Sequence, residues 1–370
     1  MRAHPERFTH RYGGHSAPGW GAGNPGGLNE AGTRGLYASA VQFGLALPHY
    51  DFSIPGESPL RFETIAAHAS AAEALDFDSL WVSDHVSLSI ERYGGPPGEQ
   101  FAFEPLTTLA AVAGVVSAPR LGTLVLSEAL RPAGVLAKAL TTLDRVCGGR
   151  LDIGIGAGWY APDFEAVGLA VPSPGERLAR LREALVVLDT LLPGGPATLN
   201  GKAHVVRGAT NLPPALQSPR PPIFVGGKGD RLLGLVAEMA DGWNTCWIWT
   251  PDDYRHRVAV LDRACEDRGR DPASVRRTLG LYALAGEDER DLAARYERMR
   301  QTAPGGMLDR VPLEQWRVGR LVGTPDQLAE QVAGWSALGV AELIVSAGPL
   351  PFSISGLEDL EVLVGALRPA

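Results

Sequence analysis

Cysteine, long apolar runs and positive charge are all scarce in this chain of 370 residues. The three cysteines, Cys147, Cys246 and Cys265, lie far apart without paired or metal-type spacing, so no disulfide framework is expected. No uninterrupted apolar run approaches the ~20 residues that cross a bilayer. A net charge of −8 argues against nucleic-acid and anionic-membrane partners, because both require basic surface. We therefore expect a cytoplasmic protein without nucleic-acid or membrane partners.

Several catalytic signatures are also missing. The sequence has no histidine and cysteine cluster with zinc-type spacing, no nucleophile elbow and no Walker loop, which disfavours metal and acyl-transfer enzymes. No metal site is predicted. The composition, 45% hydrophobic and 21% charged, is that of an ordinary soluble enzyme. The length suits one large α/β domain.

The first 40 residues differ from the rest. They contain nine glycines among scattered Pro, His and Arg, and they show no apolar periodicity. We predict a disordered extension over residues 1–40 and one folded domain over residues 41–370.

The stretch from Pro119 to Asp163 shows how that domain is organised. Two runs rich in branched apolar residues, 121–127 and 150–157, flank an amphipathic segment, 132–147. Apolar strands joined by a helix indicate a parallel sheet that helices cover on both faces. In such folds the carboxyl ends of the strands form the binding face, so functional groups are expected just after each strand.

The same unit recurs along the chain. A Ser-Pro pair at 58–59 predicts the start of the first helix, and residues 193–222 read as an insertion with a hairpin near Asn200-Gly201. Eight strand and helix units predict a (β/α)8 TIM barrel with an insertion after the fourth helix, and an open doubly wound sheet is the alternative. The expected strands cover 41–48, 78–82, 121–127, 150–157, 223–225, 242–249, 275–285 and 341–346.

Ser83-Asp84-His85 follows the second expected strand. A histidine there can exchange a proton near neutral pH, and the adjacent aspartate can bind a ring N–H or a hydroxyl. A lone Asp-His pair is weak evidence, and a loop histidine with structural hydrogen bonds is the simpler alternative. His49 follows the first strand in the same way.

Two glycine-rich segments come next. The glycines of GIGAG, 154–158, lie inside a strand and fail the dinucleotide fingerprint; they either admit a flat ring or only relieve packing in the barrel. GGKGDR, 226–231, lies between a strand and a helix and offers free N–H groups and a cation, as a phosphate site requires. A simple tight turn is the alternative there.

Aromatic residues follow two strands. Trp159 and Tyr160 can form a pocket wall, and strand alternation places Trp247 and Trp249 on one face, where they could line an aromatic pocket. Packing in the core is the alternative for the tryptophans.

Several segments, in this order, resemble the luciferase-like monooxygenase superfamily. They include FDSLWVSDH (77–85), LAKALTTLDRVCGGRLDIGIGAGWYAPDFEAVG (136–168), VGGKGDRLLGLVAEMADGWN (225–244) and GTPDQLAEQVAGWSALGVAELIV (323–345). The combination of Gly-Ala-Gly-Trp-Tyr with Ser-Asp-His is most similar to the oxidoreductases that use the deazaflavin coenzyme F420. The resemblance covers nearly everything after Val41.

The resemblance implies roles for particular residues. His85 would be the acid, Asp84 would contact the deazaflavin, and a bulge with a non-prolyl cis peptide would fall at Leu124-Val125 beside Ser127. Ala157 and Gly158 would lie near the ring, and Gly226, Gly227, Lys228 and Gly229 would hold the phosphate. The substrate pocket would be formed by His49, Trp159, Tyr160 and Trp247.

The chain departs from the sugar-phosphate dehydrogenases of that family, which carry a glutamate where Trp159 stands. We therefore expect hydride transfer between the deazaflavin and a small apolar substrate, in a homodimer. An FMN-dependent two-component monooxygenase is the alternative, because reduced flavin would fit the same barrel and phosphate loop. A barrel that binds flavin or lipid without catalysis is the third hypothesis.

Overall fold

The computed structural model describes residues 41–368, so the predicted disordered extension lies outside the described part. Parallel strands pair in the order β10, β11, β12, β14, β1, β2, β5, β7, and a further pairing of β10 with β7 closes them into a barrel. The (β/α)8 prediction is confirmed, and the open sheet is excluded. The barrel strands are β1 (Gln42–Ala46), β2 (Ser79–Val82), β5 (Arg120–Thr123), β7 (Leu151–Gly156), β10 (Ile223–Gly226), β11 (Gly242–Trp247), β12 (Arg276–Ala285) and β14 (Glu342–Ser346).

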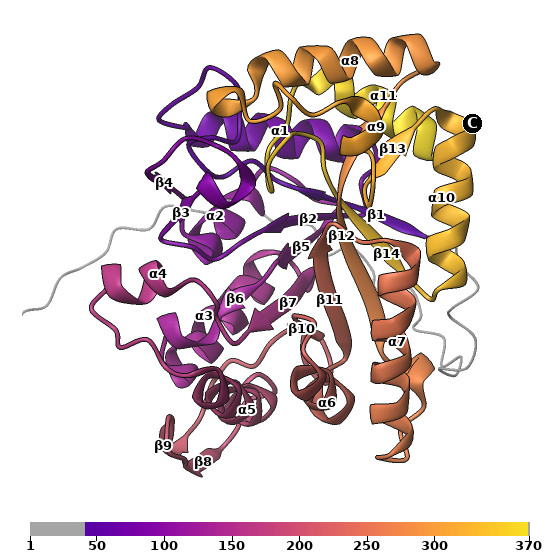
Figure 1. Ribbon diagram of the computed structural model, residues 1–370. Coiled ribbons are helices and arrows are strands. Elements are labelled where there is room, and N and C mark those ends of the chain that lie inside the picture. The colour runs from indigo at the N-terminus through magenta and orange to yellow at the C-terminus, as the bar shows by residue number, and fades with distance from the viewer. Residues whose placement is uncertain (1–40, 369–370) are drawn as a thin grey trace, which may run out of the picture. The chain divides into compact units, whose positions relative to one another are not determined.

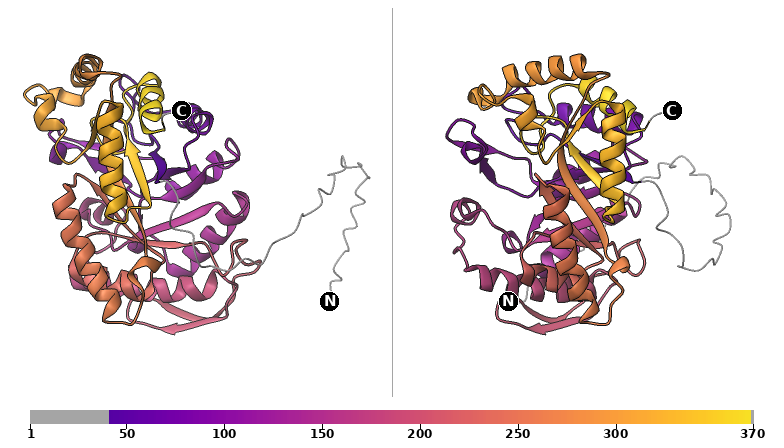
Figure 2. Two further views of the ribbon diagram at one scale, coloured as in Figure 1. Left: turned by 90° about the vertical axis from the view of Figure 1, so that its right-hand side faces the viewer. Right: turned by 45° about the vertical axis from the view of Figure 1, so that its right-hand side comes forward.

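Helices surround the barrel on all sides (Figures 1 and 2). Their apolar faces pack on the outward side chains of the strands, in one cluster that includes Leu109, Leu140, Leu188 and Val236. The barrel helices are α1 (Phe62–Ala74), α2 (Pro105–Val112), α3 (Ala133–Val146), α5 (Pro174–Leu191), α6 (Asp230–Met239), α7 (Pro251–Glu266), α10 (Pro325–Ala337) and α11 (Leu357–Leu367).

Capping residues fix several helix starts. Ser173 and Glu176 form a capping box at the start of α5, a Ser-x-x-Glu pattern that is visible in the sequence, and Glu104 accepts the Thr107 N–H ahead of α2. The prediction for α1 is wrong: Ser58-Pro59 is a cis peptide in the preceding loop, and the helix begins at Phe62 after Arg61. A Ser-Pro pair suits a loop as well as a helix start, so the pattern alone does not separate them.

Segments outside the regular repeat lie mainly at the carboxyl ends of the strands. The predicted insertion hairpin is present as β8 (Ala197–Asn200) and β9 (Val205–Ala209). The long loop after β2 contains an antiparallel pair that sequence reasoning missed, β3 (Ser87–Ser89) and β4 (Glu99–Phe101). The remaining elements are β6 (Leu126–Ser127), α4 (Ala161–Ala166), α8 (Glu289–Thr302), α9 (Leu313–Trp316), β13 (Leu321–Gly323) and the 3₁₀ turns η1 (Glu91–Tyr93), η2 (Glu128–Leu130), η3 (Pro272–Ser274) and η4 (Pro304–Gly306).

The β3–β4 pair and α4 mark the end of the barrel where a site is expected. The β3–β4 pair and α4 lie on the same side of the molecule in Figure 1. Both follow barrel strands directly, β2 and β7, so they stand at the carboxyl ends where binding groups are expected.

Candidate active site

His85 and Asp163 form the central pair of the site. The Nδ1 atom of His85, which follows β2, lies 2.6 Å from Oδ2 of Asp163 in α4. The other carboxylate oxygen accepts the backbone N–H groups of Val86 at 2.9 Å and Ser87 at 3.3 Å. Asp163 is buried, whereas the His85 side chain keeps 14% of its surface exposed. The pair therefore joins the segments that follow β2 and β7 through two residues 78 positions apart in sequence.

Asp84 faces a different partner. Its two carboxylate oxygens bind Arg131 at 2.6 and 3.0 Å, and Oδ2 also accepts the N–H of Ser127 at 2.9 Å. Arg131 in turn binds Glu104 at 2.5 Å. The predicted contact of Asp84 with the coenzyme stays a prediction, because the carboxylate is buried in this network.

The predicted non-prolyl cis peptide is present at Leu124-Val125, between β5 and β6. Ser127 follows it, and its hydroxyl oxygen is buried without a hydrogen-bond partner within residues 41–368. A Cβ at Gly158 would lie 2.7 Å from that oxygen. A buried hydroxyl left open beside small residues is a natural contact for a bound group. A second non-prolyl cis peptide, Cys246-Trp247, was not predicted.

The glycines of β7 serve packing. A Cβ at Gly154 would lie 1.9 Å from the backbone oxygen of Thr123, and one at Gly156 would lie 2.9 Å from Val125. This observation favours the packing alternative for these two glycines. Gly158 differs because its φ of +69° lies in the left-handed region that glycine adopts without strain.

The loop from Gly226 to Gly229 has the properties of a phosphate site. Gly229 is the N-cap of α6 and supplies no side-chain cap, and a Cβ there would meet nothing within 4 Å. Among the described residues, no acceptor binds the N–H groups of Lys228, Gly229 or Asp230. The Lys228 ammonium lies 5.8 Å from the centre of the Trp249 ring. Free N–H groups at a helix start and a nearby cation fit a phosphate.

Trp159 and Tyr160 stand beside His85, at ring distances of 5.5 and 5.7 Å. Tyr160 donates its hydroxyl to Glu99 at 2.7 Å and accepts the Ser89 N–H at 3.0 Å. The guanidinium of Arg92 lies 4.2 Å from the Trp159 ring centre, although 48% of Trp159 is exposed. The β3–β4 segment therefore contacts both aromatic residues and leaves about half of Trp159 exposed.

The two later tryptophans do not share a pocket. Trp247 contacts Tyr282 and Phe352, with ring distances of 5.9 and 5.1 Å. Trp249 packs against Tyr254 in the main core. The prediction of a common face is wrong because β11 ends at Trp247, so strand alternation does not reach Trp249.

His49 is fully buried. Its Nδ1 donates to the Leu47 carbonyl at 3.0 Å, and its Nε2 accepts the Ser83 N–H at 3.2 Å. Burial lowers the pKa of this imidazole to about 4, so the ring is neutral near pH 7. The ring lies 4.7 Å from Phe352, and its assignment to the substrate pocket stays a prediction.

Sequence reasoning missed Asp163 and Arg131, which partner His85 and Asp84. Both lie a few residues after a barrel strand, so the rule about strand ends could have selected them. Nothing in their local sequence indicates which side chain after strand β2 they contact.

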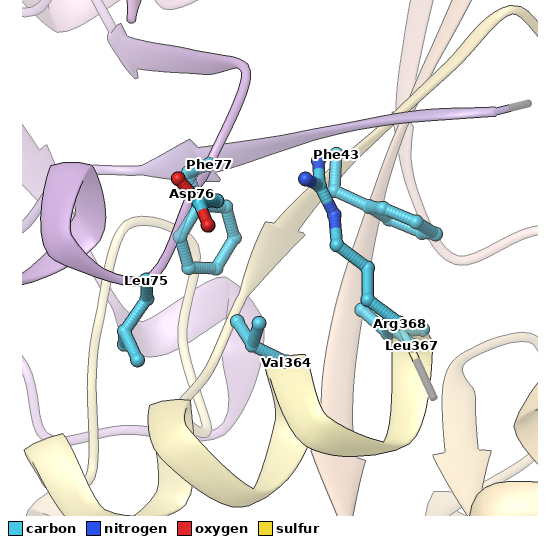
Figure 3. A pocket seen from close by; sticks show the side chains of 7 residues that line it. All are labelled: Phe43, Leu75, Asp76, Phe77, Val364, Leu367 and Arg368. Atoms are coloured by element: carbon cyan, nitrogen blue, oxygen red, sulfur yellow. The ribbon is translucent and has the colours of Figure 1, made fainter. Parts of the chain in front are cut away.

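Two hollows lie away from His85. Figure 3 shows a narrow cleft between Phe43, Phe77, Val364 and Arg368, at the amino end of β1. A cavity of about 530 Å³ lies between α4, α5 and the β8–β9 hairpin, and Phe164, Leu169, Val171 and Arg180 are among its lining residues.

The described part of the chain, residues 41–368, contains neither a membrane-spanning helix nor a cluster of metal ligands. Its helices include no segment with the length and apolar character of a membrane span. Its His, Cys, Asp and Glu side chains form no cluster that could hold a metal ion.

All the site residues described above lie within the part of the chain that matches one protein family. Residues 41–342 match the family described as luciferase-like monooxygenase. The chain belongs to this family. The resemblance read from the sequence is thereby confirmed, together with the prediction of an enzyme of this family.

Individual proteins of known name are less than 30% identical to this chain. A phthiodiolone/phenolphthiodiolone dimycocerosates ketoreductase of Mycobacterium tuberculosis is 26% identical over 342 residues, 78% of this chain and 88% of that protein. An F420-dependent glucose-6-phosphate dehydrogenase of Microbacterium testaceum is 28% identical over 291 residues, 74% of this chain and 84% of that protein. The solved structure of an F420-dependent secondary alcohol dehydrogenase has the same fold, with a TM-score of 0.70, 17% identity, and coverage of 89% of this chain and 100% of that one.

Proposed function

We propose that this protein is a coenzyme F420-dependent oxidoreductase that transfers a hydride between the deazaflavin and a small apolar carbonyl or alcohol compound. The observation that carries the proposal is the position of His85, which follows a barrel strand with Nδ1 engaged by Asp163 and part of its ring exposed. A relative named as F420-dependent, 28% identical over most of its length, supports the choice of coenzyme.

The residues of this chain fit the coenzyme at two places. The Gly226–Gly229 loop would hold its phosphate through free N–H groups, with Lys228 nearby. The open hydroxyl of Ser127 and the small residues Ala157 and Gly158 would contact the ring system. When bound, the deazaflavin supplies or accepts a hydride and reacts poorly with oxygen.

His85 would exchange the proton that accompanies the hydride. In the direction of reduction, Nε2 gives a proton to the carbonyl oxygen as the carbon gains the hydride; in the direction of oxidation, Nε2 takes the hydroxyl proton. In both directions one proton and one hydride are exchanged with the substrate, so the substrate gains or loses two hydrogens without a change of charge. Tyr160 and the β3–β4 segment would limit the access of water to this exchange.

An apolar substrate suits the lining. Trp159 and Tyr160 flank His85, and Trp247 contributes a further ring near Phe352. Trp159 occupies the place of the glutamate expected in sugar-phosphate dehydrogenases, which argues against a sugar-phosphate substrate. The mycobacterial relative is named a ketoreductase, in agreement with a carbonyl substrate.

The test is a titration of the purified protein with coenzyme F420 and with FMN, each in both redox states, followed by fluorescence or calorimetry. Micromolar binding of the deazaflavin, with turnover of simple ketones or secondary alcohols, supports the proposal. Preference for reduced FMN, with oxygen consumption in the presence of a flavin reductase, would assign the protein to the monooxygenases. Binding of neither would favour a non-catalytic barrel.

Two further expectations accompany the proposal. We expect a homodimer in solution, which light scattering coupled to gel filtration measures. A cytoplasmic location is also expected, and cell fractionation tests it.

A further inference from the structure

We infer that Asp163 is a positioning residue that fixes which nitrogen of His85 carries the proton and where the other nitrogen points. The inference rests on the proposed function for its kinetic consequence only. Its structural part, the protonation pattern of the imidazole, stands on the contacts of Asp163 and holds with or without the coenzyme.

The two carboxylate oxygens of Asp163 have different hydrogen-bond partners. Oδ2 lies 2.6 Å from Nδ1 of His85, and Oδ1 accepts the N–H groups of Val86 and Ser87. The backbone N–H groups are fixed donors, so the carboxylate cannot rotate without losing them. Its orientation, and with it the point offered to His85, is therefore set by the chain just after His85.

An ionised carboxylate only accepts hydrogen bonds, so Nδ1 must carry the hydrogen when it faces Oδ2. In the neutral ring the lone pair is then on Nε2. Within residues 41–368, no hydrogen-bond partner binds Nε2. The neutral ring thus presents a proton acceptor to the site, and the protonated ring presents an Nε2–H donor, as reversible hydride chemistry requires.

The same carboxylate ties His85 to the covering segment. Val86 and Ser87 lead into β3, and the Ser87 hydroxyl donates to Glu99 of β4 at 2.7 Å. Glu99 also accepts the hydroxyl of Tyr160. A short path of hydrogen bonds therefore sets the imidazole and its aromatic cover in one arrangement, and α4 and β3 both lie on the side of the barrel shown at the left of Figure 1.

Asp163→Asn separates positioning from folding. The Asn side-chain oxygen can still accept from Val86 and Ser87, because the reverse orientation would point its NH₂ group at two N–H donors. Its NH₂ group then faces Nδ1, which must become the acceptor. The substitution keeps the size and the backbone bonds and inverts the tautomer of His85, leaving Nε2 protonated in the neutral ring.

The first readout is the tautomer itself. Protein with ¹⁵N-labelled histidine is measured by long-range ¹H–¹⁵N NMR at about pH 9, where imidazoles are ordinarily neutral. The His85 signals are assigned by their loss in His85→Gln. We expect a protonated Nδ1 in the native protein and a protonated Nε2 in Asp163→Asn.

The second readout is kinetic. With the F420 coenzyme and a turned-over ketone or alcohol, Asp163→Asn should lower kcat about 10²- to 10⁴-fold, by analogy with other His-Asp pairs, and leave the Kd of the coenzyme within a few-fold. Asp163→Glu keeps an accepting carboxylate and should retain the native tautomer and more activity than the Asn variant. Glu165→Gln, which removes an exposed charge two residues along α4, is the matched control and should behave like the native protein.

The outcomes separate the two proposals. An unchanged His85 tautomer in Asp163→Asn, or an unchanged kcat, overturns the positioning role. A switched tautomer in a protein that neither binds F420 nor turns over any of these substrates supports the positioning role and removes the proposed function. A loss of activity in Glu165→Gln equal to that in Asp163→Asn would assign the effect to the charge of α4 and would also overturn the inference.

Discussion

Arg131 binds both carboxylate oxygens of Asp84, the residue that precedes His85. The Asp84 side chain is 3% exposed, and the arginine side chain is 18% exposed. This pair joins the end of β2 to the segment after β6, and Asp84 also accepts the N–H of Ser127 in β6. One nearly buried ion pair thus fixes the candidate acid relative to the segment that we propose contacts the coenzyme.

Arg131→Ala should destabilise the protein strongly, because it leaves the buried Asp84 carboxylate without its cation. We expect a loss of about 3 kcal/mol in the free energy of unfolding, measured by urea denaturation. Arg182→Ala is the matched control, since it breaks a more exposed pair with Glu238 and should cost less than about 1 kcal/mol. Equal losses in the two variants would contradict this account of Asp84.

His85→Ala should abolish most turnover and spare coenzyme affinity. Loss of a general acid typically lowers the rate about 10²- to 10⁴-fold, whereas the phosphate loop that would hold the coenzyme is untouched. The measurement is kcat with saturating F420 together with the Kd of the coenzyme. Unchanged turnover would remove His85 from the acid role.

The buried imidazole of His49 should make stability pH-dependent. Its pKa is about 4 in the folded protein and about 6.5 when exposed, so the unfolded state binds the proton more readily between these values. Stability is therefore fully present above about pH 6.5 and declines as the pH falls towards 4, by about 3 kcal/mol in all.

Urea denaturation of the native protein and of His49→Gln at pH 7.5 and pH 5 measures this effect. The gap between the two proteins should narrow at pH 5. His256→Gln, which replaces an exposed histidine, should keep a constant difference from the native protein. A constant gap for His49→Gln would show that its ring does not carry the pH dependence.

Gly154→Ala should be severely destabilising. The added Cβ would lie 1.9 Å from the Thr123 carbonyl oxygen, so β5 and β7 would have to move apart. Overpacking of this kind costs about 1–3 kcal/mol or more, and thermal unfolding reports it. Gly134→Ala places its Cβ in open space within α3 and should instead stabilise the helix by up to about 1 kcal/mol. A small loss of thermal stability in Gly154→Ala would mean that β5 and β7 can move apart at little cost and would contradict this account.

Lys228→Ala should weaken coenzyme binding about 10-fold and leave the free energy of unfolding almost unchanged, because on our proposal the ammonium would bind a phosphate and the residue is exposed. Calorimetric titration with F420 measures the affinity. Lys202→Ala, which removes the same charge from the insertion hairpin, should leave the Kd at its native value. An unaltered Kd in Lys228→Ala would assign phosphate binding to the backbone alone.

The sequence by itself determined the fold and the end of the barrel that carries the site. Apolar strands alternating with capped amphipathic helices allow few closed arrangements, so the order of elements was enough to predict the barrel. The same local rules fixed the capping box of α5 and the hairpin near Asn200, since each depends on residues a few positions apart. The cis peptide at Leu124-Val125 came from family resemblance.

Only the tertiary structure decided which side chains meet. His85 pairs with Asp163 and Asp84 with Arg131 across 78 and 47 residues, and no periodicity encodes such partners. The packing role of Gly154 likewise depends on the neighbouring strand, and Trp249 joined the core because β11 ended two residues earlier. Local sequence sets the type and approximate length of each element, whereas the contacts between the loops after β2, β5 and β7 depend on how these strands pair side by side.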